Sequence, residues 1–301
     1  MDNLERKKYW IWLSLIKGIG VKSKQKLLEK YKDPERIYNA RRNELLAISG
    51  IGEKIVNNIL DVNTRKEINN HIAYMQENDI DIISINDNMY PQDLRNIYDA
   101  PISLYIKGNK EILNDISIGI VGCRDASEYG KEASKYFSYN LARNNVNVVS
   151  GLAKGIDSYA HKGALCVRNT ADNLCAGRTI AVVGNGLDIV YPKENFRLAE
   201  MIVENGGTII SEYPLGTKPH KMNFPARNRI ISGISKGVLV IEAKERSGTL
   251  ITVDFALEQG RDVFIVPGNI NSSNSIGTNN LIKQGAKVVT KYDDVLEELN
   301  K

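Results

Sequence analysis

The chain has 301 residues, of which 42% are hydrophobic and 25% are charged, and its formal net charge is +4 at pH 7. These values are typical of globular proteins, so they exclude a disordered chain and predict one large packed domain with a smaller one. No apolar stretch is long enough to span a membrane, and the polar start at residues 1–8 does not resemble a signal peptide. Cys123, Cys166 and Cys175 lack Cys-x-x-Cys spacing, which favours reduced thiols and a cytoplasmic protein.

Positive charge is concentrated at the N-terminal end of the chain. Residues 1–66 carry 15 Lys and Arg against 8 Asp and Glu, a balance of +7, whereas the remaining residues carry 25 against 28, a balance of −3. A basic module before a nearly neutral body indicates contact with a polyanion, although a solvated lysine-rich surface would give the same counts. We expect the first domain to span residues 1–66.

This basic module contains an internal repeat. Gly18-Ile19-Gly20 and Gly50-Ile51-Gly52 each lie between two segments with helical periodicity. Glycine permits the tight turn, and the following helix presents free N–H groups and the positive end of its dipole to an anion. The pattern resembles the SAM-like helix-hairpin-helix family of nucleic-acid backbone binders, so Gly18, Gly20, Gly50 and Gly52 are candidate backbone-binding positions. A scaffold that only contacts proteins would use the same turns.

Apolar runs alternate with amphipathic segments in the rest of the chain. Short strands are expected at Ile80–Ile85 and Ser103–Lys107, in a connecting segment at residues 67–110. The last domain, residues 111–301, is expected to contain helices at Lys131–Arg143, Asn195–Glu204 and Ile251–Gln259, and strands at Ser117–Val121, Val146–Val149, Ile180–Val183, Thr208–Ile210, Val238–Ile241, Val263–Val266 and Lys287–Val289. This alternation predicts an α/β fold: a Rossmann-like, doubly wound, mainly parallel sheet that binds ligands beyond the carboxyl ends of its strands.

Small and polar residues follow these predicted strands. They form the segments Gly122–Arg124, Ser150–Asp157, Gly184–Asp188, Ser211–Tyr213 and Ala243–Thr249. Small residues let the backbone approach a ligand, and consecutive N–H groups form anion nests. The segments predict a phosphate-binding crevice whose candidate residues are Arg124, Ser150, Gly151, Lys154, Ser247 and Gly248.

Sequence signatures of catalysis and of cofactors are missing. There is no GxGxxG, because Gly184-Asn185-Gly186 lacks a third glycine, and there is no GxxxxGK[ST] motif. The string Gly233–Gly237 fits GxSxG, but it precedes the predicted strand Val238–Ile241 instead of following a strand, so it is not a nucleophile elbow. No His, Cys and carboxylate cluster has metal-ligand spacing. Asp157 and His161 lie four residues apart on one predicted helix face, a spacing that is more often structural than catalytic. The sequence therefore predicts binding without catalysis, cofactor or metal.

The segment Pro219–Ser235 gathers basic and aromatic residues before an apolar helix. Lys221, Arg227 and Arg229 can neutralise phosphates, and an exposed Phe224 ring can stack on an unpaired base. Alternatively, Phe224 anchors the loop in the core and an arginine pairs with an acid. We expect such a pair for one of the two arginines.

The ordered motifs from Asp79 onward resemble those of the DNA-processing protein A family, called DprA or Smf. They include Tyr90-Pro91, Gly122-Cys123-Arg124, Ser150–Asp157, Gly184–Asp188, Tyr191-Pro192, Phe224–Arg229, Ser247-Gly248-Thr249, Gly260-Arg261 and Pro267-Gly268. The resemblance implies a homodimer that binds single-stranded DNA and loads RecA recombinase onto it in transformation or recombination. It also implies that Arg124, Lys193, Lys221 and Phe224 belong to the DNA pocket.

Two departures and two rival functions accompany this resemblance. Cys123 stands where the family commonly has Ser or Thr, and residues 167–177 are longer than the usual link, which is simplest as a surface loop. Nucleoside monophosphate phosphoribohydrolases have a related fold, so an enzyme or sensor for free nucleotides is one rival. Their Pro-Gly-Gly-x-Gly-Thr loop is followed closely by a catalytic glutamate, whereas no carboxylate follows Thr249 before Asp254. A scaffold that only contacts recombination proteins is the other.

Overall fold

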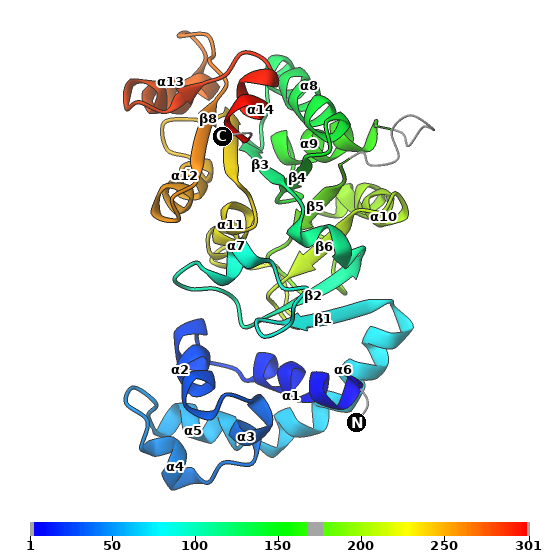
Figure 1. Ribbon diagram of the computed structural model, residues 1–301, viewed down its shortest axis with the longest axis vertical. Helices are drawn as coiled ribbons and strands as arrows, with labels where there is room; N and C mark the ends of the chain where they lie inside the picture. The colour runs from blue at the N-terminus through cyan, green and yellow to red at the C-terminus, as the bar shows by residue number, and fades with distance from the viewer. Residues whose placement is uncertain (1–2, 168–176, 300–301) are drawn as a thin grey trace.

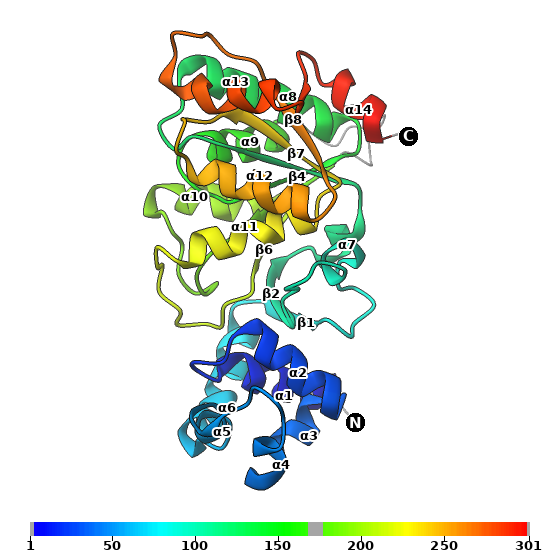
Figure 2. The same cartoon turned by 90° about the vertical axis from the view of Figure 1, so that its left-hand side faces the viewer.

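The computed structural model describes residues 3–167 and 177–299, in which a helical module precedes an α/β domain (Figures 1 and 2). The strands are β1 (Ile80–Ser84), β2 (Ser103–Gly108), β3 (Ser117–Gly122), β4 (Asn147–Ser150), β5 (Thr179–Val182), β6 (Thr208–Ser211), β7 (Gly237–Glu242), β8 (Asp262–Ile265) and β9 (Lys287–Val288). The α-helices of the module are α1 (Asn3–Leu15), α2 (Val21–Tyr31), α3 (Pro34–Tyr38), α4 (Arg42–Leu46), α5 (Glu53–Ile59) and α6 (Val62–Glu77). Those of the α/β domain are α7 (Gln92–Arg95), α8 (Glu128–Arg143), α9 (Ile156–Leu165), α10 (Phe196–Glu204), α11 (Asn223–Gly233), α12 (Gly248–Glu258), α13 (Ile276–Lys283) and α14 (Asp293–Leu299).

The helical module contains both predicted Gly-Ile-Gly turns. The first joins α1 to α2 and the second joins α4 to α5. Gly18 and Gly50 have φ values of 71° and 84°, in the left-handed region that favours glycine, while Gly20 and Gly52 are the N-cap residues of α2 and α5. The predicted helix-hairpin-helix arrangement is therefore confirmed.

In the described residues, one sheet runs in the order β1-β2-β6-β5-β4-β3-β7-β8-β9. The pairs β1–β2 and β2–β6 are antiparallel, and all other neighbours are parallel. Helices α8, α9 and α10 pack on one face, and α11, α12 and α13 pack on the other. The doubly wound, mainly parallel sheet is confirmed, with predicted strand ends displaced by one residue at most positions.

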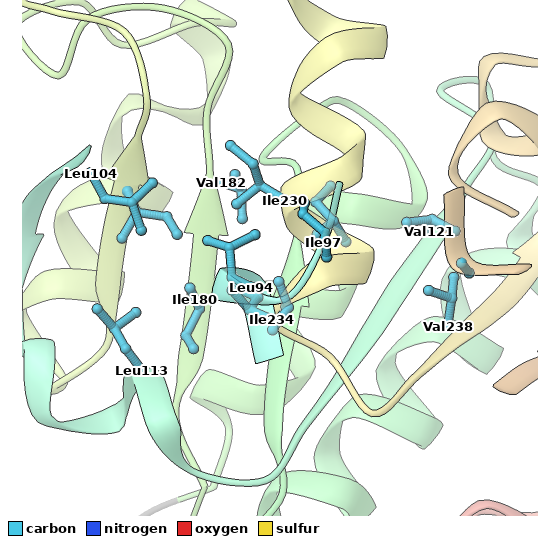
Figure 3. Close-up of a cluster of buried hydrophobic side chains, with 14 of the residues drawn as sticks. Leu94, Ile97, Leu104, Leu113, Val121, Ile180, Val182, Ile230, Ile234 and Val238 are labelled. Carbon is cyan, nitrogen blue, oxygen red and sulfur yellow. The ribbon is translucent and has the colours of Figure 1, made fainter. Parts of the chain in front are cut away.

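Burial explains why the parallel strands read as apolar runs. Every residue of β4, β5, β6 and β7 is buried, because helices cover both faces of the sheet. Figure 3 shows part of this core, where Ile180 and Val182 of the sheet lie near Leu94 of α7, Ile230 of α11 and Ile234, which directly follows α11.

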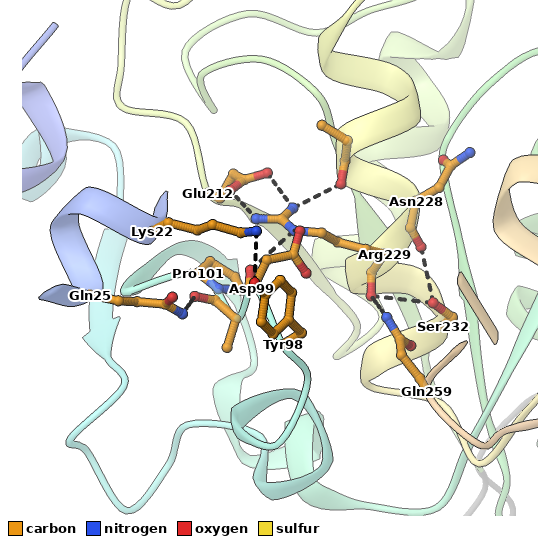
Figure 4. Close-up of polar contacts among 12 residues, drawn as sticks. Lys22, Gln25, Tyr98, Asp99, Pro101, Glu212, Asn228, Arg229, Ser232 and Gln259 are labelled. Atoms are coloured by element: carbon orange, nitrogen blue, oxygen red, sulfur yellow. Dashed lines mark hydrogen bonds and ion pairs between the residues drawn. The ribbon is translucent and has the colours of Figure 1, made fainter. Parts of the chain in front are cut away.

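Two of the expected domain limits do not coincide with boundaries in the structure. The limit at residue 66 lies inside α6, which continues to Glu77, and the expected connecting segment 67–110 contributes β1 and β2 to the sheet. The module also packs on that sheet, since Trp12 shares an apolar cluster with Tyr105 of β2, and the Tyr105 hydroxyl lies 2.6 Å from Ser14 Oγ. Figure 4 shows Lys22 and Gln25 of α2 reaching the Tyr98–Pro101 segment, where Lys22 donates to the Tyr98 hydroxyl at 2.9 Å.

The expected loop at residues 167–177 lies almost entirely outside the described residues, as does Cys175. Cys123 is buried and Cys166 is exposed, and both are free thiols. Among the helices in the described part of the chain, none has the length and apolarity needed to cross a membrane.

Candidate functional site

A cleft of about 630 Å³ lies where the direction of winding reverses. The chain proceeds outward from β3 through β4 and β5 and then returns to place β7 on the other side of β3. The connections that follow β3 and β7 therefore diverge and leave a crevice beyond the carboxyl ends of these two strands. The cleft is lined by parts of three segments, 121–125 at the end of β3, 244–252 after β7 and 219–231 around the start of α11, together with Ala153, Asp157 and Tyr191.

Arg124 and two aromatic rings form one wall of the cleft. The Arg124 side chain is exposed, and its guanidinium carbon lies 5.6 Å from the centroid of the half-buried Phe224 ring. Phe224 stacks on Tyr191, with ring centroids 5.5 Å apart and an interplanar angle of 27°. Among the described residues, no carboxylate lies within ion-pair distance of Arg124. This wall therefore offers a guanidinium beside a stacked aromatic pair.

Further cations surround this wall. Lys221, Lys244 and Arg246 are exposed and line the cleft. Lys244 lies 3.5 Å from the Asp125 carboxylate, in a pair whose partners are 46% and 88% exposed, so solvent screens the attraction. The cleft is consequently rich in positive charges that are only weakly paired with carboxylates.

Sequence reasoning did not single out Lys244, Arg246 or Tyr191 as site residues. The sequence feature that could have identified the two cations is the segment Ala243–Thr249, which follows a predicted strand and carries Lys244 and Arg246 before Ser247-Gly248. The predicted site residues Ser247 and Gly248 do line the cleft. Ser247 is the N-cap of α12, and its hydroxyl accepts a hydrogen bond from the Thr249 N–H. A side-chain atom added at Gly248 would meet only open space.

Arg227 forms the floor of the cleft and is 4% exposed. It donates to the Gly151 carbonyl at 2.7 Å and to the Val182 carbonyl, and it faces Asp157. Asp157 accepts the Gly151 N–H at 3.2 Å; burial raises its pKa and the Arg227 charge counteracts that rise. Burial also lowers the pKa of Arg227 to about 10. Gly151 is confined, because a Cβ there would lie 2.5 Å from the guanidinium.

Several other predicted residues lie outside the cleft lining. Ser150 is fully buried, and its hydroxyl donates a hydrogen bond to the Ile120 carbonyl at 2.7 Å, so the hydroxyl serves the core and does not face a ligand. Lys154 forms an exposed ion pair with Glu194, and Lys193 is exposed next to it. Ala153 and Asp157 of the segment Ser150–Asp157 line the cleft with Arg124, but the predicted residues Ser150, Gly151, Lys154 and Lys193 do not, and neither do the glycine turns of the module.

Arg229 is the arginine that pairs with an acid, as expected for one of the two. It is 3% exposed and binds both Glu212 carboxylate oxygens at 2.7 Å, with Asp99 at 2.9 Å (Figure 4). Burial alone would lower the pKa of Arg229, but the Glu212 carboxylate holds it above the usual value. Helix α11 begins at Asn223, so Phe224, Arg227 and Arg229 lie on the helix rather than before it, and Pro225 is tolerated in its first turn.

The Asp157–His161 spacing does not create a catalytic pair. His161 is fully buried, and its Nδ1 lies 2.7 Å from the Thr179 hydroxyl. Burial lowers the pKa of His161 to about 3, which keeps the imidazole neutral. Within residues 3–167 and 177–299, no group of three His, Cys, Asp or Glu side chains is arranged to hold a metal ion.

Two protein families match this chain, one over the α/β domain and one over the helical module. The family described as DNA recombination-mediator protein A matches residues 81–300, and the SAM-like helix-hairpin-helix tandem matches residues 13–62. The DNA processing protein DprA of Streptococcus pneumoniae is 49% identical over 71% of this chain and 73% of its own length. Protein Smf of Escherichia coli is 43% identical over 78% of this chain and 61% of its own length.

Solved structures of such proteins have the same fold. The X-ray structure of DNA processing protein A from Streptococcus pneumoniae matches with a TM-score of 0.78 and 39% identity over 97% of both chains. A structure that describes the single-stranded DNA binding mode of DNA processing protein A from Helicobacter pylori matches with a TM-score of 0.64 and 27% identity, over 73% of this chain and 95% of that one. The chain thus belongs to the DNA recombination-mediator protein A family.

Proposed function

We propose that the cleft binds single-stranded DNA with little dependence on sequence. The observation that carries the proposal is the stacked pair of Tyr191 and Phe224 beside Arg124, with Lys221 and Arg246 at the same cleft. Cations that follow a phosphate backbone, combined with rings on which bases stack, are the usual means of holding a single strand without reading its sequence.

A single strand fits this arrangement better than a duplex. The Phe224 ring is half-buried inside the cleft, so a base can reach it only when it is unpaired and turned out of a helix. The single-stranded DNA binding mode described for the Helicobacter pylori relative supports the same assignment.

We propose further that the cleft is not catalytic. Asp157 already accepts the N–H groups of Gly151 and Ala153 and faces Arg227, so it is poorly placed to act as a base. A nucleotide hydrolase of related fold would also need a glutamate soon after Ser247-Gly248-Thr249, where the sequence has none.

Family membership supports two more parts of the proposal: that the chain forms a homodimer, and that it loads RecA recombinase onto DNA in transformation or recombination. Exposed apolar side chains are available for such contacts around the β8–β9 end of the sheet. They are Leu257, Ile270, Ile276 and Val288, which are 61%, 86%, 39% and 41% exposed.

Titration of fluorescent oligonucleotides at several salt concentrations tests the DNA-binding proposal. We expect tighter binding of a single strand than of a duplex with the same sequence. The logarithm of the binding constant should fall with the logarithm of salt concentration, with a slope of about −3 if four cations each neutralise one phosphate (~−0.7 per contact). Equal affinity for both DNA forms, or affinity that does not respond to salt, would contradict the proposal.

The helical module is proposed to contact the DNA backbone through its two glycine turns. Lys17 directly precedes Gly18, Lys54 lies two residues after Gly52, and both lysines are exposed. Because the module packs on the sheet, point substitutions test it better than deletion of residues 1–66. The double variant Lys17→Ala/Lys54→Ala should keep its melting temperature, bind DNA several-fold more weakly and make the salt slope shallower by about 0.7 for each lysine. Unchanged affinity and slope would leave the module with a structural or protein-binding role.

A further inference from the structure

A second basic and aromatic surface lies on the outer side of α8 and α9, away from the cleft lining. The ammonium nitrogens of Lys131, Lys135 and Lys162 lie 5.7, 5.1 and 4.9 Å from the centroid of the Tyr159 ring. Lys135 and Lys162 are exposed and form no ion pair in the described residues. Lys131 does form an ion pair with exposed Glu128 at 2.6 Å, and this hydrogen bond, helped by the Lys135 charge, lowers the pKa of Glu128. We call these three lysines and Tyr159 the α8–α9 surface.

The spacing of these residues extends the surface along both helices. Lys131, Lys135 and Tyr139 are four residues apart on α8, so they share one helix face, and Tyr139 is 37% exposed. Tyr159 and Lys162 are three residues apart on α9. Basic and aromatic side chains therefore occur together on two helices that pack against each other, which is the composition of a track for a single strand.

Like charges gathered around one ring repel one another. The ring face offsets part of this repulsion, because an ammonium group is attracted to aromatic electron density. A polyanion would turn the remaining repulsion into attraction, and the ring would at the same time offer a stacking surface to a base. An acidic protein would use the lysines but has less need of the aromatic rings.

The α8–α9 surface begins close to the cleft. The first residue of α9, Ile156, donates its N–H to the Cys123 carbonyl at 3.1 Å, and Gly155 is pressed against the backbone of Arg124. Tyr159 lies about one helical turn farther on, a rise of ~5 Å. Helix α8 starts at Glu128, shortly after Arg124, and Figure 1 shows α8 beside α9. A strand that leaves the cleft past Arg124 therefore meets this surface next.

We propose that single-stranded DNA continues from the cleft onto the α8–α9 surface, where Lys131, Lys135 and Lys162 bind phosphates and Tyr159 stacks on a base. This inference rests on the proposed function of the cleft. It assigns a DNA path longer than the cleft alone can hold.

The test compares oligothymidylates of about 5 and about 20 nucleotides, chosen because sites of this kind hold roughly 4–16 nucleotides. The variant Lys135→Ala/Lys162→Ala should bind the long strand roughly five- to tenfold more weakly, with a salt slope shallower by about 1.4, and should bind the short strand as the unchanged protein does. Tyr159→Leu should weaken only the long strand as well. Lys236→Ala/Lys283→Ala removes two charges elsewhere and is expected to change neither affinity.

The two strand lengths separate failure of the inference from failure of the proposed function. If the unchanged protein binds neither strand, or if Arg124→Ala leaves short-strand affinity intact, the cleft assignment fails and this inference fails with it. If Arg124→Ala weakens both strands but Lys135→Ala/Lys162→Ala retains full long-strand affinity and salt slope, the cleft assignment stands and the α8–α9 surface does not hold DNA.

Discussion

Replacing Arg124 by alanine is expected to weaken single-stranded DNA binding by tenfold to a few hundredfold while leaving the melting temperature unchanged. The guanidinium is exposed, lies over Phe224 and has no ion-pair partner in the described residues. Loss of a charge-assisted hydrogen bond to a phosphate costs about 1.5–3 kcal/mol, and each ~1.4 kcal/mol is a factor of ten in affinity. Fluorescence anisotropy and thermal unfolding of the same preparation measure both quantities.

Conservative and neighbouring variants serve as controls for Arg124. Arg124→Lys keeps the charge but loses the planar fork of donors, so it should bind with intermediate affinity. Lys221→Ala should act in the same direction with a smaller effect. A rival account makes Arg124 a structural partner of Asp157 or Glu212, and it predicts a destabilised protein that still binds DNA fully. That result would remove Arg124 from the site.

Replacing Arg229 by alanine should instead lower the free energy of unfolding by about 3–5 kcal/mol. The change leaves the Glu212 carboxylate, which is 10% exposed, without the two hydrogen bonds that Arg229 now donates. An uncompensated buried charge is the physical cause of the loss. Denaturant unfolding measures the effect, and the folded fraction should bind single-stranded DNA with nearly normal affinity.

The matched control for this prediction removes both charges. Arg229→Met combined with Glu212→Leu removes the buried carboxylate, and the other acid that Arg229 binds, Asp99, is 36% exposed and so remains partly solvated. This variant should recover much of the stability that Arg229→Ala loses. An Arg229→Ala protein that keeps its stability but no longer binds DNA would show that Arg229 belongs to the DNA site, contrary to the role assigned to it here.

The parallel part of the fold was predictable because burial on both faces forces apolar strands. Such runs as Ile118–Val121 and Val238–Ile241 mark the strands, and the small residues after them mark the crevice. Arg124 could be placed at the cleft on this basis alone, since it follows β3 directly. The two Gly-Ile-Gly turns were predictable for an equally local reason, because the positive φ at Gly18 and Gly50 favours glycine.

Features that depend on distant partners could not be predicted in this way. Arg227 and Arg229 are two residues apart on α11 and therefore point in different directions, one to the cleft floor and the other to Glu212 and Asp99. No local pattern distinguishes them. Likewise, β2 joins the sheet through antiparallel pairing with β6, about 100 residues later, which periodicity within 67–110 cannot reveal.

The central claim is that bases of a single strand stack on the paired rings of the cleft. Photocrosslinking is the most direct test of this claim. A short oligonucleotide that carries a photoreactive thymine analogue would be irradiated with the full chain, and the adducts would be mapped by mass spectrometry. The stacked geometry of Tyr191 and Phe224, with centroids 5.5 Å apart, predicts adducts on one or both rings, strongly reduced in Arg124→Ala. Adducts confined to peptides that contain neither Tyr191 nor Phe224 would contradict the claim.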